Sequence, residues 1–206
     1  MSELKLTQQE IDSREWHNDG TAITGHAEFD KNGYFVLRDL IDPTEFNDVF
    51  PEDIGKYEWF DDNIDNFNHE SDEGQVHGCT SRRNYPPHKP LHDKVGRKLE
   101  KIIGRKLYPT YQFDRFYSPG QKLWTHLDRH TCEISCTIHI NSNIRQDWPI
   151  WIKLPDTYDN PVYDKRKRII KKGEYRSVSL NRGDAMIYKG CERPHWRNEL
   201  QKEFIK

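Results

Sequence analysis

The sequence predicts a single domain that is mainly β with flanking helices, arranged as a β-sandwich or jelly roll. Two observations predict this class. The C-terminal two-thirds consists of short segments of period-two alternation, separated by turns rich in Gly, Pro, Asn and Asp. Before them comes one segment whose apolar residues recur at helical spacing. A chain of 206 residues suits one such domain and would be cramped as two.

Residues 1–104 contribute one strand and two helices to this prediction. Residues 33–38 form an apolar run after the Asn32-Gly33 turn, which predicts a strand. Asp42 then caps a short helix that runs through Phe46. The better supported helix ends at Gly104, a suitable left-handed cap, and its apolar positions are Leu91, Val95, Leu99, Ile102 and Ile103. We expect this helix to pack on the outside of a sheet.

From residue 111 onward, alternate residues share a strand face. The sequence places Tyr111, Phe113, Arg115 and Tyr117 on one face of a strand, and Trp124, His126 and Asp128 on one face of the next. In the following strand, Ile134, Cys136, Ile138 and Ile140 alternate with Ser135, Thr137 and His139. Later strands are predicted over residues 150–154, 175–180 and 185–188.

Composition and charge exclude several classes of protein. A net charge of -2 gives no overall attraction to nucleic acid or to an anionic membrane. No apolar stretch approaches the roughly 20 residues that span a bilayer, and residues 1–10 do not resemble a signal peptide. We therefore expect a cytoplasmic protein with neither a membrane nor a nucleic-acid partner. The one cationic run, residues 165–172, is better explained as a charged hairpin edge than as a nucleic-acid contact.

The four cysteines show no regular spacing, so we expect reduced thiols. Cys132 and Cys136 stand four apart with histidines nearby, which raises the alternative of a zinc site. The segment alternates like a strand, whereas a zinc knuckle needs a turn between its thiols.

A metal-binding pattern occurs at His126-Leu127-Asp128. Residues two apart in a strand project from one face, so this imidazole and this carboxylate can reach one ion. His195 follows the predicted strand 185–188 at the distance that a jelly roll needs to fold back. The three would form a facial triad of two histidines and one carboxylate, with three octahedral positions left open. Alone, an HxD triplet is more often a hydrogen-bonded structural pair than a metal site.

Several ordered blocks around this triplet resemble the prolyl-4-hydroxylase-like branch of the 2-oxoglutarate oxygenases, and a bacterial and phage subgroup in particular. The blocks cover about residues 90–200: residues 111–122, residues 126–129, residues 132–138, residues 147–150, residues 182–185 and residues 188–197.

The resemblance implies a double-stranded β-helix, cupin-like in architecture, in which His126, Asp128 and His195 bind Fe(II). It implies an enzyme that uses 2-oxoglutarate and O2 to hydroxylate a C–H bond, with ascorbate as an optional reductant, and that releases succinate and CO2. The substrate would be a peptide, an amino acid or a small metabolite. Residues 1–206 would then be one oxygenase domain, with residues 1–105 supporting a core of residues 106–206.

The resemblance also implies a cation for the tail carboxylate of 2-oxoglutarate, about ten residues after the distal histidine. That position is Ile205, and the sequence stops at Lys206, where we expect the last core strand to begin. Either the sequence given lacks its natural C-terminus, or Arg197, Arg115 or Lys206 supplies the charge. Arg197 is the first candidate, because it belongs to the His-Trp-Arg block, and Arg115 the second, because it shares a face with Tyr117. Arginine suits the task, since its planar fork can bind a carboxylate through two hydrogen bonds. An ordinary ion pair is an equal alternative for each candidate.

Two further residues are placed beside the co-substrate. The resemblance puts Tyr117 there, and alternation puts His139 on the interior face, where ordinary polar lining is the alternative. Two other functions stay open. One is a cupin-type metalloenzyme that uses no 2-oxo acid, although cupins usually draw more histidines from two motifs. The other is a non-catalytic β-sandwich that binds a sugar or a protein.

Overall fold

The computed structural model describes residues 27, 29–46, 75–77, 79–155 and 174–202. The cationic run 165–172 and the candidate cation Lys206 lie outside this part. Helical segments of this part include residues 29–32, the 3₁₀ segments η1 (Pro43–Phe46) and η4 (Pro86–His88) and the α-helix α3 (Lys89–Ile103). The strands are β1 (Tyr34–Leu37), β2 (Thr80–Arg83), β3 (Phe113–Phe116), β4 (Leu123–His126), β5 (Ser135–Ile138), β6 (Ile150–Lys153), β7 (Tyr175–Val178), β8 (Ala185–Tyr188) and β9 (His195–Arg197).

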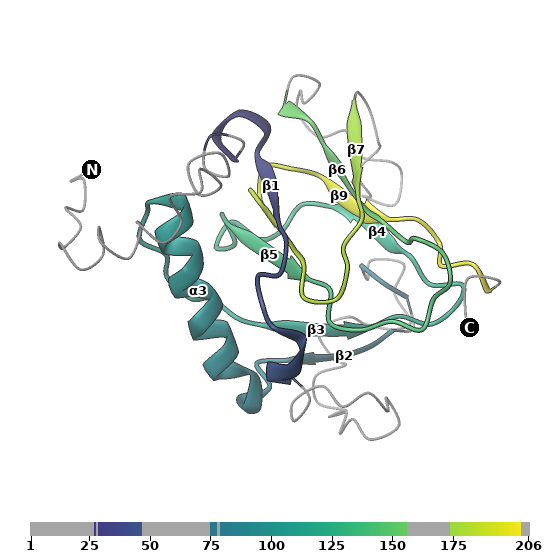
Figure 1. The fold of residues 1–206 in the computed structure, drawn as a ribbon. Coiled ribbons are helices and arrows are strands. Elements are labelled where there is room, and N and C mark those ends of the chain that lie inside the picture. Colours follow the sequence, from purple (N-terminus) through teal and green to yellow (C-terminus); the bar gives the residue numbers. More distant parts are fainter. Residues whose placement is uncertain (1–26, 28, 47–74, 78, 156–173, 203–206) are drawn as a thin grey trace.

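The strands form three antiparallel groups with the orders β1-β8-β5, β2-β3 and β4-β9-β6-β7 (Figure 1). Strand β8 lies between β1 and β5, so that Tyr188 faces both Tyr34 and Ser135 in the register. In the other large sheet β9 lies between β4 and β6, which sets His195 opposite His126. These pairings make the fold a mainly β jelly roll of the double-stranded β-helix type, as the sequence predicted.

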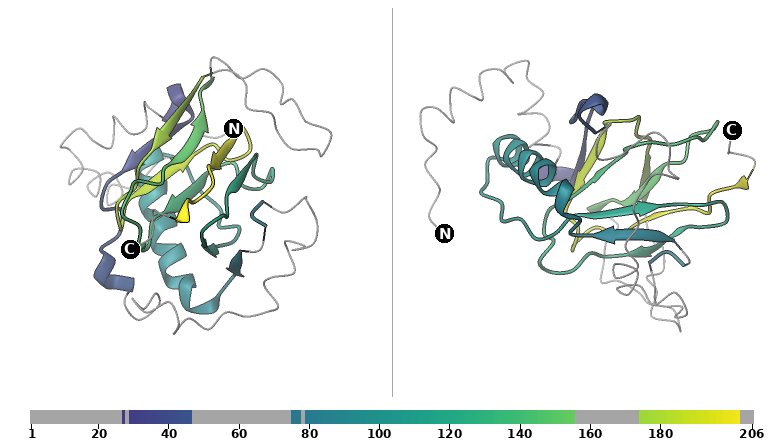
Figure 2. Two further views of the ribbon diagram at one scale, coloured as in Figure 1. Left: turned by 90° about the vertical axis from the view of Figure 1, so that its right-hand side faces the viewer. Right: turned by 90° about the horizontal axis from the view of Figure 1, so that it is seen from below.

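Helix α3 covers the outer face of the β1-β8-β5 sheet (Figure 1, Figure 2). Its buried residues Val95, Leu99, Ile102 and Ile103 form one core cluster with Phe35 of β1 and Ile187 of β8. The side chains of β5 that pack on this cluster are Cys136 and Ile138, together with Ile134 and Ile140 beside the strand. The predicted outside helix is therefore confirmed, and it ends at Gly104 with φ of 73°.

The inner face of the same sheet packs against the second sheet. Met186 and Tyr188 of β8 meet Ile150 and Ile152 of β6 and Val178 of β7 in a second core cluster. Because strand side chains alternate, the residues of β5 that do not touch α3 point into the space between the sheets. This interior is where the polar residues of the candidate site gather.

The structure departs from the sequence prediction at two strands. Strand β2 was not predicted, since Thr80-Ser81-Arg82-Arg83 lacks apolar alternation; it forms by pairing with β3. Strand β4 ends at His126, and its register shifts between Leu123 and His126. Asp128 therefore lies beyond the strand, and the prediction that it shares one strand face with His126 was wrong.

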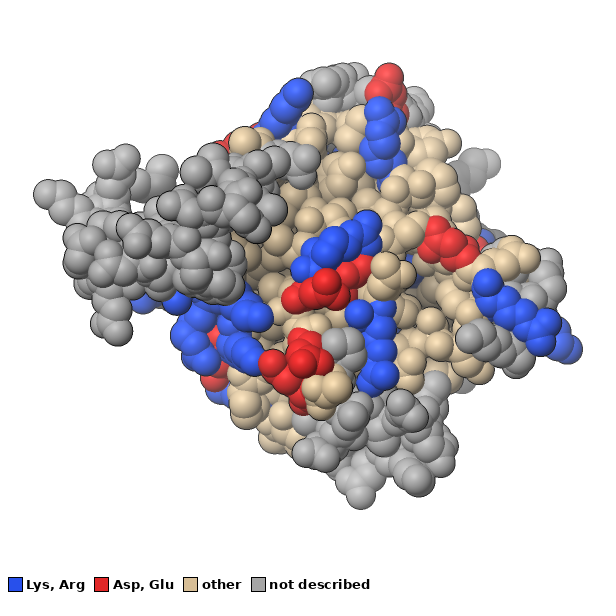
Figure 3. Space-filling view, viewed as in Figure 1, with Lys and Arg blue, Asp and Glu red and all other residues tan. Residues whose placement is uncertain are grey.

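On the face shown in Figure 3, basic and acidic side chains of described residues are interspersed. Lys89 and Asp93 of α3 form one solvent-exposed ion pair. Among the helices of the described ranges, none combines the length and apolar character needed to cross a bilayer. All four cysteines have unpaired thiols.

Candidate metal centre

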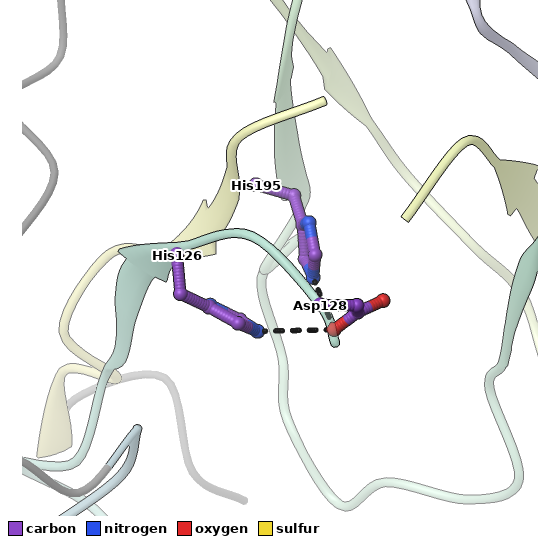
Figure 4. A group of neighbouring side chains, drawn as sticks. All are labelled: His126, Asp128 and His195. Atoms are coloured by element: carbon purple, nitrogen blue, oxygen red, sulfur yellow. Dashed lines mark ion pairs between the residues drawn. The ribbon is translucent and has the colours of Figure 1, made fainter. Parts of the chain in front are cut away.

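Three side chains from two distant parts of the chain converge inside the jelly roll (Figure 4). Nε2 of His126, at the end of β4, and Nε2 of His195, at the start of β9, each lie 3.6 Å from Oδ1 of Asp128. The three potential ligand atoms lie within 4.8 Å of one another. The cross-strand pairing of His126 with His195 brings the imidazole rings to a centroid separation of 4.2 Å.

Backbone carbonyls select the tautomer of both imidazoles. Nδ1 of His126 lies 2.7 Å from the Trp124 carbonyl oxygen, and Nδ1 of His195 lies 3.0 Å from that of Arg193. A carbonyl only accepts hydrogen bonds, so each Nδ1 carries the proton and each Nε2 keeps its lone pair. The lone pairs then face Asp128, which is the arrangement that an imidazole ligand needs.

The charges of the site favour a cation. Burial lowers the pKa of His195 to about 4, helped by the neighbouring His126, so this imidazole is neutral at pH 7. Burial also raises the pKa of Asp128, but the close approach of His126 and His195 and the hydrogen bond from the Ser135 hydroxyl outweigh it and hold the pKa below its ordinary value. Two imidazoles and one carboxylate form the donor set of a facial triad, and the residues present fit a divalent first-row metal.

Asp128 is held by the loop after β8 and by β5. Its backbone N–H donates to the Gly190 carbonyl at 2.9 Å, and its Oδ2 accepts a 2.5 Å hydrogen bond from the Ser135 hydroxyl. Oδ1 is the oxygen that faces the two imidazoles.

A cavity of about 1490 Å³ opens beside the triad and reaches along β3 and β5. The phenol of Tyr188 points into it, with its oxygen 3.3 Å from Nε2 of His195 and 3.3 Å from Oγ1 of Thr137. Tyr117 lines the same cavity and meets the Trp148 ring edge-on at a centroid distance of 4.9 Å. The cavity thus carries hydroxyl donors close to the triad.

The candidate cations for an anionic ligand also line this cavity. Arg197 is 9% exposed, donates to the Trp148 carbonyl at 2.5 Å and places its guanidinium 4.8 Å from the centre of the Trp148 ring. Burial lowers its pKa, and within the described part of the chain no carboxylate forms an ion pair with it. A buried guanidinium of this kind favours binding of an anion.

Arg115 and His139 lie in different surroundings. Arg115 donates to the Tyr117 hydroxyl at 3.3 Å and to Oε1 of Gln75 at 2.9 Å. Nε2 of His139 lies 3.2 Å from Oγ of Ser142, and burial, followed by the charge of Arg197, lowers its pKa. Both line the cavity. The third cation considered, Lys206, lies outside the described residues.

Three residues of this site were not singled out from the sequence. Tyr188 ends the apolar segment Ala185–Tyr188, where a phenol would ordinarily be core packing, and Ser135 is one polar residue in an alternating strand. Gly190 follows in a turn. The available signals were the resemblances of the blocks 132–138 and 188–197, which contain these three residues but give none of them a role.

Comparison with known proteins supports the fold and goes no further. No family model and no curated protein matches the chain. The solved structure of a Pseudomonas putida prolyl-4-hydroxylase is similar with a TM-score of 0.57 and 13% identity, over 86% of this chain and 91% of that one. OsALKBH1 aligns over 84% of this chain and 89% of its own with 13% identity, but its TM-score of 0.42 is too low to carry any argument. The chain therefore shares the double-stranded β-helix fold with a solved prolyl-4-hydroxylase.

Proposed function

We propose that this chain is an Fe(II)- and 2-oxoglutarate-dependent oxygenase that hydroxylates a C–H bond. The observation that carries the proposal is the convergence of two Nε2 lone pairs and Oδ1 of Asp128 beside a large cavity. Three ligands on one side of an ion leave three octahedral positions for a 2-oxo acid and dioxygen. Fe(II) at this site would couple decarboxylation of 2-oxoglutarate to insertion of one oxygen atom from O2 into the substrate, giving alcohol, succinate and CO2.

Each residue of the site has a task in this proposal. His126, Asp128 and His195 hold the metal, and Asp128 offsets part of its charge. Arg197 binds the tail carboxylate of 2-oxoglutarate, because its buried guanidinium lines the cavity and forms no ion pair with a carboxylate among the described residues. Tyr117 and His139 line the pocket of the co-substrate.

We place the chain in the prolyl-4-hydroxylase-like branch, on the ordered sequence blocks and the shared fold. We propose one oxygenase domain over residues 1–206, located in the cytoplasm and acting on a peptide, an amino acid or a small metabolite. The support from residues 1–105 includes β1, which pairs with β8 of the core.

The test is anaerobic purification with Fe(II), followed by measurement of bound metal and of succinate release from 2-oxoglutarate across peptides and amino acids. His126→Ala and Asp128→Ala should abolish metal-dependent succinate formation while unfolding stays cooperative, because neither side chain belongs to the apolar core clusters. His77→Ala, which removes an exposed imidazole, is the matched control and should retain activity. Undiminished turnover in either triad variant would contradict the proposal.

Two other functions are separated by the same assay. A cupin-type enzyme would bind the metal but would turn over its substrate without 2-oxoglutarate. A binding module would take up no metal with 1:1 stoichiometry. The donor set of two imidazoles and one carboxylate favours the oxygenase, since these are the ligands of the facial triad.

A further inference from the structure

The position of Asp128 is not determined by the strand that carries His126. Strand β4 ends at His126, so Asp128 follows in a segment without strand pairing. Its backbone N–H is bonded to Gly190, whose own N–H donates to the Glu133 carbonyl at 3.1 Å. The carboxylate therefore depends on contacts from the loop after β8 and from the start of β5.

Ser135 makes the decisive contact with this carboxylate. Its hydroxyl donates to Oδ2 of Asp128 at 2.5 Å, while Oδ1 faces both imidazoles at 3.6 Å. Ser135 is fixed in turn, because β5 pairs with the buried strand β8 and sets Ser135 opposite Tyr188. A hydroxyl bonded to one carboxylate oxygen fixes the rotation of the group and lowers the availability of that oxygen to a metal.

Gly190 supplies the space for this arrangement. A Cβ atom built on it would lie 2.5 Å from Oδ2 of Asp128 and 2.7 Å from the Cys132 carbonyl oxygen, and closer still to Oγ of Ser135. Real Cβ atoms do not approach other atoms this closely. Any side chain at position 190 would therefore displace the Ser135 hydroxyl or the carboxylate.

We infer that Ser135 and Gly190 are positioning residues that make Asp128 a ligand through Oδ1 alone. The inference rests on the proposed function, because it concerns the same metal. One-oxygen coordination leaves the other positions of an octahedron open, whereas a carboxylate that turned to bind through both oxygens would occupy one of them. The Ser135 contact thus sets how many positions remain for the 2-oxo acid and O2.

The experiment compares Ser135→Ala and Gly190→Ala with the wild-type chain. Affinities for Mn(II) and for Fe(II) are measured anaerobically by competition with a chelator, and the visible d–d absorption of the Co(II)-loaded protein reports coordination. The melting temperature of the metal-free protein is recorded in parallel. Ser177→Ala, an exposed serine on β7, and Gly96→Ala, where a Cβ meets nothing within 4 Å, are the matched controls.

We expect Ser135→Ala to weaken metal binding by about 10- to 100-fold, the usual effect of losing a hydrogen bond behind a metal ligand, and to change the Co(II) spectrum. Gly190→Ala should weaken metal binding further, and both controls should match the wild type in metal affinity and in the Co(II) spectrum. A purely structural role of Ser135 would lower the melting temperature and leave the affinity and the spectrum unchanged, which overturns the inference. Absence of metal binding by the wild-type chain would instead refute the proposed function, and the inference with it.

Discussion

The phenol oxygen of Tyr188 lies 3.3 Å from Nε2 of His195, the nitrogen that also faces Asp128. A metal ion on that nitrogen would take up its lone pair, and the phenol would then need another acceptor. Oγ1 of Thr137 lies 3.3 Å away, and an oxygen of a molecule bound beside the ion would be a second acceptor. We predict that Tyr188→Phe binds the metal nearly as well as the wild type but binds 2-oxoglutarate about tenfold more weakly, the effect of one hydrogen bond to a charged group. Titration of the Mn(II)-loaded protein with 2-oxoglutarate measures this.

The control is Tyr175→Phe, which removes the hydroxyl of a 45% exposed tyrosine on β7. It should change neither affinity. Equal affinity of Tyr188→Phe and wild type for 2-oxoglutarate would show that the phenol only fills space beside His195.

Replacement of Arg197 tests the anion site. Arg197→Ala should raise the dissociation constant of 2-oxoglutarate by about 10- to 100-fold, because it removes a charge-assisted contact in a buried place. Metal affinity should change much less. The dissociation constant of Arg197→Lys for 2-oxoglutarate should lie between those of the wild type and Arg197→Ala, since an ammonium group keeps the charge but loses the planar fork. If Arg115→Ala proves the more damaging change in the same titration, the tail carboxylate binds to Arg115 instead.

Asp184 should be a major source of stability that depends on pH. This carboxylate is 2% exposed and accepts hydrogen bonds from Arg38 at 2.6 Å, from the Asn181 N–H at 2.8 Å and from the Asp39 N–H at 3.1 Å. Burial raises its pKa, but these donors outweigh burial and hold the pKa below its ordinary value. Asp184→Asn should therefore lower the free energy of unfolding at pH 7 by about 2 kcal/mol, as measured by urea denaturation.

The sign of the pH effect follows from the lowered pKa. The contribution of Asp184 is fully present above the ordinary carboxyl pKa of 3.8 and is lost as the pH falls through the lower folded value. The stabilities of wild type and Asp184→Asn should thus approach each other in acid. Asp93→Asn, which removes an exposed carboxylate paired with Lys89 on α3, should have no measurable effect. A constant difference between wild type and Asp184→Asn across this range would mean that the loss is one of packing.

Two glycines of the same helix should respond to alanine with opposite signs. Gly96 lies inside α3 with open space around a built Cβ, so Gly96→Ala should stabilise the protein by about 0.5–1 kcal/mol. Gly104 caps the helix at φ of 73°, so Gly104→Ala should destabilise it by about 1 kcal/mol. Thermal unfolding of both variants measures the difference, and the same sign in both would contradict the cap assignment.

Local chemistry made part of the fold predictable. Helix α3 follows from apolar residues at helical spacing and a terminal glycine. Strand β5 follows from the alternation of polar and apolar residues from Ser135 to Ile138. Strand β2 could not be found in this way, because its polar residues become a strand only through their partner β3. Propensity describes a segment by itself, whereas pairing depends on a neighbour distant in the sequence.

The candidate site was also predictable only in part, because some of its contacts depend on residues distant in the sequence. The sequence pointed to His126, Asp128 and His195, and the structure brings their side chains together, although not by the route assumed for Asp128. A two-residue spacing implies a shared face only while the strand continues, and β4 ends too early. The contact between Ser135 and Asp128 was invisible because it depends on the space left by Gly190.

The strand order of the β1-β8-β5 sheet has a consequence for how the molecule assembles. Its middle strand is made after both of its neighbours, and Tyr34 must wait for Tyr188 before it gains a cross-strand partner. Such high contact order places folding in the range of roughly milliseconds to seconds. The second imidazole is synthesised later still, on β9, so a nascent chain that meets an iron ion early offers it only half of the nitrogen donors. Metal capture should accordingly follow folding, and iron supplied during refolding should not accelerate it.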